Sequence, residues 1–111
     1  MGFLLSFSRK LYLTQYMHSI NSKINDKLEE KQRLTNTITD YQMKINDIGD
    51  SDSPAVKKLQ KLKAEIEAYE KKVDIEIQKL QTQLQAANTE IQSADQMLQS
   101  EIQRSFSYRA A

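Results

Sequence analysis

The residue types that could do chemistry in this chain are few and scattered. His18 is the only histidine among the 111 residues and there is no cysteine, so neither a histidine cluster nor a thiolate is present to bind a metal ion. The segment DIGDSD, residues 47–52, has the composition of a calcium loop but lacks the ligand spacing and the closing glutamate of an EF-hand. No serine has a base placed for nucleophilic catalysis. We therefore expect no enzymatic activity, no metal ion and no cofactor.

The overall composition favours long polar helices rather than a packed globule. Charged residues make up 28% of the chain and apolar residues 39%, with two glycines and one proline. The net charge of +1 predicts no attraction to nucleic acid. No stretch has the ~20 apolar residues that span a bilayer, and the segment MGFLLSF is too short for a secretory signal.

Apolar residues recur at steps of three and four in both halves of the sequence, which predicts two α-helices and no strands. In the first half these are Met17, Ile20, Ile24, Leu28, Leu34, Ile38, Tyr41, Ile45 and Ile48. In the second half they are Leu59, Leu62, Ile66, Tyr69, Val73, Ile77, Leu80, Leu84, Ala87, Ile91, Ala94, Leu98 and Ile102. The second series averages about 3.6 residues per step, which indicates a nearly straight helix rather than a left-handed coiled coil.

The segment IGDSDSPAV, residues 48–56, predicts a turn between the two helices. Gly49 suits the left-handed position just past a helix C-terminus. Ser53 is a good N-cap, and Pro54 fits the first position of the next helix, where a missing N–H costs nothing. The sequence therefore predicts a single all-α domain, a long antiparallel two-helix hairpin, coiled-coil-like and packed into a larger helical assembly. We expect helix one at about 3–48, the turn at 49–53, helix two at about 54–106 and a short C-terminal tail.

Folding the chain about this turn pairs residues whose numbers sum to about 101. Lys31 then lies on the apolar stripe opposite Glu70. This register predicts an ion pair between Lys31 and Glu70 across the two helices.

The ends of the chain are much less charged than its middle. Antiparallel pairing places the charge-poor stretch from Leu80 to Ser100 beside residues 1–21, where apolar residues cover most of the helix circumference. A helix that is apolar all round requires burial. We therefore predict an assembly interface made of Phe3, Leu4, Leu5, Phe7, Leu11, Tyr12, Leu13, Tyr16, Ile91, Leu98, Ile102 and Phe106.

Two segments resemble the needle-forming subunits of type III secretion systems. DSDSPAV is similar to the turn of that family, and IQSADQMLQSEIQRSF is similar to its closing helix. The matching residues are Ser53, Pro54, Ile91, Asp95, Ile102 and Phe106. The resemblance implies a helical hairpin whose terminal helices polymerise around a channel, and it implies secretion.

Three functions remain open. The first is a structural protein that self-assembles into a filament, needle or similar oligomer, with copies of itself as partners, at a bacterial surface or exported without a cleaved signal. The second is a cytoplasmic coiled-coil adaptor or chaperone-like module that binds another helical protein. The third is a peripheral membrane protein anchored by residues 3–17, since residues 1–25 are basic and contain no acid, and MGFLLS matches the pattern for N-myristoylation.

Overall fold

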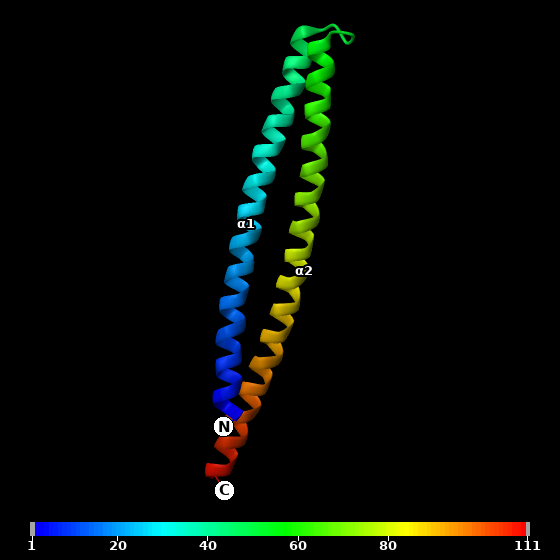
Figure 1. Ribbon diagram of the computed structural model, residues 1–111. Coiled ribbons are helices and arrows are strands. Elements are labelled where there is room, and N and C mark those ends of the chain that lie inside the picture. Colours follow the sequence, from blue (N-terminus) through cyan, green and yellow to red (C-terminus); the bar gives the residue numbers. More distant parts are fainter. Residues whose placement is uncertain (1, 111) are drawn as a thin grey trace. The chain divides into compact units, whose positions relative to one another are not determined.

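Two long α-helices make up almost all of the chain. The structure, a computed structural model, describes residues 2–110: helix α1 spans Gly2–Ile48 and helix α2 spans Pro54–Ala110, with no strand in this range. The helices run antiparallel (Figure 1), which confirms the predicted hairpin. The predicted C-terminal tail after residue 106 is wrong, because α2 continues to Ala110. The segment after Phe106 contains no glycine or proline that would end a helix.

Gly49 ends α1 in the conformation that its sequence position predicted. Its φ is 76°, and its N–H donates to the carbonyl of Ile45 at 3.1 Å, which satisfies one of the free carbonyls at the end of the helix. The following residues then form a turn in which the Asp52 N–H donates to Asp50 Oδ1 at 3.0 Å.

Ser53 caps the start of α2. The Ser53 Oγ accepts a hydrogen bond of 3.2 Å from the N–H of Ala55, and the Ser53 carbonyl accepts the first helical bond from Lys57 at 3.1 Å. Pro54 occupies the first helical position, where no N–H is needed. Gly49, Ser53 and Pro54 therefore fix where one helix stops and the next begins.

The contact between the helices is a seam of buried and half-buried positions that recur every 3.5 residues on average, the period of a coiled coil. On α1 the seam consists of Ser6, Lys10, Leu13, Met17, Ile20, Ile24, Lys27, Lys31, Leu34, Ile38, Tyr41 and Ile45. On α2 it consists of Val56, Leu59, Leu62, Ile66, Glu70, Val73, Ile77, Leu80, Leu84, Ala87, Ile91, Ala94, Leu98 and Glu101.

The seam corrects the predicted apolar stripes at four positions. Leu28, Ile48, Tyr69 and Ile102 are exposed, and the predicted period of 3.6 for α2 is replaced by 3.5. A helix that stays against its partner must present residues at the coiled-coil period, so apolar residues spaced at 3.6 drift away from the seam.

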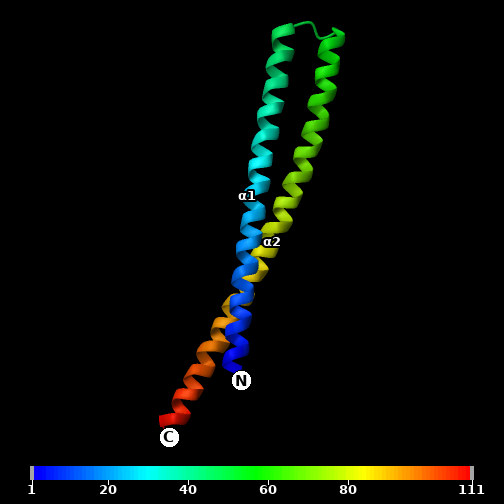
Figure 2. The ribbon, with the colours of Figure 1, turned by 60° about the vertical axis from the view of Figure 1, so that its left-hand side comes forward.

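The chain divides into two units that each contain parts of both helices. The terminal unit comprises residues 2–23 and 80–110, and the turn unit comprises residues 24–79. Figures 1 and 2 both show the blue segment of α1 beside the orange segment of α2, the pairing that forms the terminal unit.

Candidate functional site

The fully buried side chains that α2 contributes to the terminal unit are small. Ser6, Leu13 and Ile20 recur every seven residues on α1 and are buried, with Leu13 at 6% exposure. From α2 the buried residues are Ala87 and Ala94. Each alanine adds only one carbon beyond the backbone, so α2 contributes little fully buried apolar volume to this unit.

Most of the predicted assembly interface is exposed in the single chain. Among the side chains that the structure describes in the terminal unit, ten large apolar ones are exposed: Phe3, Leu4, Leu5, Phe7, Leu11, Tyr12, Tyr16, Met97, Ile102 and Phe106. Nine of them were predicted from the sequence. Met97 was not in the predicted set, although it belongs to a series with Ala64, Ile75 and Ala86, spaced by eleven residues, that marks a second ridge on α2.

Three residues of the predicted interface belong to the seam instead. Leu13 is buried, and Ile91 and Leu98 are half-buried. All three occupy heptad positions, so the neighbouring helix of the same chain already covers them. Leu13 is therefore not available to a partner, whereas Ile91 and Leu98 keep part of their surface exposed.

The exposed apolar residues of α1 form two groups on opposite sides of the seam. Consecutive residues of an α-helix are 100° apart, so Leu5 and Phe7 lie on either side of the buried Ser6. The rings of Phe3 and Phe7 stack on one side with centroids 6.3 Å apart. On the side of Leu5, the rings of Tyr12 and Tyr16 stack with centroids 6.5 Å apart.

Helix α2 extends both groups. Phe3, Ile102 and Phe106 line one open hollow of about 340 Å³ together with Glu101 and Ser105, so Ile102 and Phe106 lie on the side of Phe7. Met97 precedes the seam residue Leu98, whereas Ile102 follows the seam residue Glu101, which places Met97 on the opposite side of α2. Leu4 lies three residues before Phe7 and seven before Leu11, so it belongs to the same side of α1. We define the Phe7 face as Phe3, Leu4, Phe7, Leu11, Ile102 and Phe106, and the Tyr12 face as Leu5, Tyr12, Tyr16 and Met97.

Ion pairs within the chain neutralise four of the charges that border these faces. Arg9 Nη2 lies 3.4 Å from Glu90 Oε2, and Lys10 Nζ lies 2.7 Å from Asp95 Oδ1. Exposed pairs of this kind contribute only about 0–1 kcal/mol to stability. Their larger effect is on solvation, because a paired charge opposes the burial of neighbouring apolar surface less than an unpaired one.

Glu101 is the one residue of the terminal unit's seam on α2 that is charged. Its Oε2 is buried and has no hydrogen-bond partner, and a Cβ at position 2 would overlap the carboxylate, which would have to move aside. The predicted stripe passed through Ile102 and therefore missed this residue. Counting in sevens from Ala87 and Ala94 would have found it.

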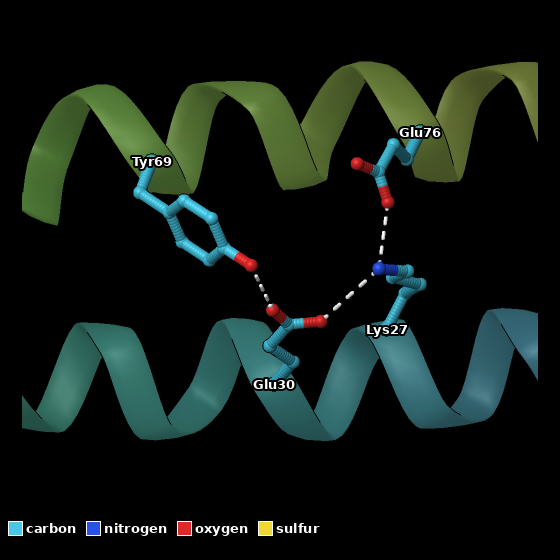
Figure 3. A network of polar contacts seen from close by, with 4 residues as sticks. All are labelled: Lys27, Glu30, Tyr69 and Glu76. Atoms are coloured by element: carbon cyan, nitrogen blue, oxygen red, sulfur yellow. Dashed lines mark hydrogen bonds and ion pairs between the residues drawn. The ribbon is translucent and has the colours of Figure 1, made fainter.

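The turn unit has a different kind of cluster, a chain of polar contacts across the two helices (Figure 3). Tyr69 donates from its hydroxyl to Glu30 Oε1 at 2.8 Å, and Lys27 Nζ lies 3.3 Å from Glu30 Oε2 and 2.6 Å from Glu76 Oε2. The bond from Tyr69, followed by that from Lys27, lowers the pKa of Glu30. The bonds to Glu76 and Glu30 raise the pKa of Lys27, and the bond to Glu30 raises the pKa of Tyr69.

The predicted ion pair between Lys31 and Glu70 is replaced by another. Lys31 Nζ lies 2.8 Å from Asp74 Oδ1, and this bond raises the pKa of Lys31. Glu70 instead accepts a hydrogen bond of 3.1 Å from the hydroxyl of Thr35. Both contacts join residues whose numbers sum to 105 rather than 101, so the register between the helices differs here by four residues from the predicted one, although the turn keeps its predicted bounds.

The described residues contain no group of three or more histidines, cysteines or acids that could hold a metal ion. Within residues 2–110, neither helix has a stretch both long and apolar enough to cross a bilayer. His18 is exposed on α1. The residues that stand out are therefore those of the Phe7 and Tyr12 faces.

Comparison of the chain with protein-family models, with curated proteins and with solved structures gives no match.

Proposed function

We propose that the protein is a structural subunit that self-assembles through its terminal unit into a filament, needle or similar oligomer. The observation that carries this proposal is the concentration of ten exposed large apolar side chains in the terminal unit. At typical side-chain areas they leave on the order of 1,000 Å² of apolar surface uncovered, divided between two groups on opposite sides of the seam. Each group, on the order of 500 Å², is as large as the largest apolar patch of a typical monomer, roughly 300–600 Å², and patches of that size are often functional.

The sparse charge of the same unit supports assembly. Only eight of its residues are Lys, Arg, Asp or Glu, against 23 in the turn unit, which is of almost equal length. Charged residues are depleted in the cores of protein interfaces because removing them from water is costly. The resemblance to needle subunits agrees with an assembled state and favours the filament form.

Sedimentation velocity and electron microscopy of the purified chain test this proposal. We expect oligomers whose size grows with concentration, and a monomer at high concentration would contradict it. The double variant Leu5→Glu with Leu11→Glu places one carboxylate among each group of exposed apolar residues and should give a helical monomer. The matched control, Met43→Glu with Ile75→Glu, makes the same chemical change at two exposed positions of the turn unit and should assemble like the original chain.

A coiled-coil adaptor is the second candidate, favoured by the hollow between Phe3, Ile102 and Phe106. An open hollow lined by aromatic and aliphatic side chains suits an apolar side chain from another helical protein. A closed dimer or tetramer of defined size, with no growth on concentration, would favour this function over a filament.

A further inference from the structure

The Phe7 face and the Tyr12 face each have the size of one protein interface. From the observed exposures and ordinary side-chain areas, each face leaves on the order of 500 Å² of apolar surface uncovered. A standard interface buries about 800 Å² per partner, of which roughly 56–65% is apolar. Each face therefore matches one interface, and the terminal unit has surface for two neighbours.

The two faces differ in chemistry. The Phe7 face consists of hydrocarbon side chains, and Ser105 and Glu101 complete the lining of its hollow. The Tyr12 face presents two phenol rings and a methionine, and beside Met97 lies a second hollow with the polar side chains of Ser93, Gln96, Ser100, Glu101 and Arg104. A surface with hydroxyl groups and a flexible thioether can adapt to a partner, whereas the Phe7 face offers a recess to be filled.

Resting on the proposed function, we propose that assembly is heterologous: the Phe7 face of one copy docks on the Tyr12 face of the next. A two-fold dimer formed through either face would leave the other face, on the order of 500 Å² of apolar surface, in water. A contact between unlike faces covers both with a single type of interface, and it repeats from copy to copy to give a ring or a filament.

The charges of the two hollows favour the same arrangement. Glu101 is the only charged residue that lines the hollow of the Phe7 face, whereas the hollow beside Met97 is lined by both Glu101 and Arg104. Two Phe7 faces brought together would oppose one carboxylate to another. The unlike contact instead adds the guanidinium of Arg104 to the surface that meets the carboxylate of the next copy, which reduces the repulsion.

A mixing experiment with two single variants tests the proposal. Phe7→Glu blocks the Phe7 face and Tyr12→Glu blocks the Tyr12 face, and both positions are exposed, so the helical content should be unchanged. Each variant alone lacks one of the two required faces, and its self-association should weaken about 100-fold or more, which leaves monomers. An equimolar mixture restores one intact pair of faces and should give a one-to-one heterodimer that grows no further.

Gln15→Glu is the control, since Gln15 is exposed on α1 between the two groups and belongs to neither face. It should assemble normally. Circular dichroism of every variant shows whether the helices are retained, and sedimentation equilibrium gives the stoichiometry.

Other results would overturn the proposal in distinct ways. If Tyr12→Glu alone formed a stable dimer through its Phe7 faces, or if mixing restored nothing, heterologous docking would be wrong while self-assembly stood. If the original chain were a monomer in solution, the proposed function itself would fail. Flotation of that monomer with anionic lipid vesicles, lost in both variants, would assign the two faces to a membrane surface instead.

Discussion

The terminal unit and the turn unit are built from the same two helices, yet they differ in how their side chains are paired and buried. The turn unit holds 23 charged residues and joins its helices by bonds among Lys27, Glu30, Tyr69 and Glu76 and by the pair of Lys31 with Asp74. The terminal unit has eight charged residues, buries small alanines in its seam and leaves twice as many large apolar side chains exposed, ten against five. The turn unit therefore pairs most of its polar side chains within the chain, whereas the terminal unit has apolar surface that only a further contact would cover.

The largest effect expected is from Leu13→Glu. This change buries a carboxylate without a partner and should destabilise the terminal unit by at least about 3 kcal/mol. If the two units differ in stability as well as in composition, hydrogen exchange will show loss of protection in residues 2–23 and 80–110 while residues 24–79 remain protected. The control Leu13→Met keeps the volume and should cost less than about 1.5 kcal/mol. Uniform loss of protection along both helices would show that the units unfold as one.

A smaller effect is expected from enlarging the alanines of the seam. Ala87→Leu or Ala94→Leu should force the two helices of the terminal unit apart and cost about 1–3 kcal/mol, because both sites are buried. Ala86→Leu adds the same atoms at an exposed neighbouring position and should be nearly neutral. Thermal unfolding followed by circular dichroism compares the three. Equal melting temperatures for Ala86→Leu and Ala87→Leu would mean that the helices of this unit are not closely packed.

The turn provides the next test, now within the turn unit. Gly49→Ala should destabilise the hairpin by roughly 1 kcal/mol, because φ is 76° and an L-residue is strained there. The nearest atom to an added Cβ is the carbonyl oxygen of Asn46 at 3.9 Å, so the cost is in the backbone and not in a clash. Gly49→Asn should cost less, since asparagine tolerates this conformation best after glycine. Chemical denaturation measures both, and an unchanged midpoint for Gly49→Ala would contradict the assignment of strain.

The smallest effect expected is a pH dependence confined to the turn unit. The pKa of Glu30 is lowered from its usual 4.5, so its bonds stabilise the folded state above that value and are lost as the pH falls through the folded pKa. The pKa of Tyr69 is raised above 10.0 and that of Lys27 above 10.5, so their stabilisation is present below these values and is lost as the pH rises through the folded pKa.

Melting temperatures measured from pH 2 to 12 should therefore fall at both extremes. Glu30→Gln removes the carboxylate and should reduce the fall in melting temperature at acid pH. Hydrogen exchange should show the acid-induced loss of protection first in residues 24–79. If the melting temperature of Glu30→Gln fell by the same amount at acid pH as that of the original chain, other carboxylates would be responsible for the dependence.

The fold was predictable because Gly49, Ser53 and Pro54 each specify their own backbone conformation, without reference to distant residues. The seam was predictable only to within one residue. Apolar character alone selects Tyr69 and Ile102, whereas the facing helix requires the 3.5-residue period and therefore covers Glu70 and Glu101. The partner of Lys31 depends on the register of one helix against the other, and composition does not contain that information. The exposed apolar residues were predictable as a group, but their division into two faces required the position of the seam.

The hairpin turn also has a consequence for the order in which the chain folds. Contacts next to Gly49 and Ser53 close short loops, and the entropic cost of closure rises with the number of residues between the partners. Helix pairing should therefore begin at the turn and zip toward the ends, so that Lys63 with Gln42 forms early and Lys10 with Asp95 forms last. Pulse-labelled hydrogen exchange would show protection in residues 38–66 before residues 2–17. During that interval the most apolar stretches of the chain are unpaired, so premature aggregation should begin at the two termini.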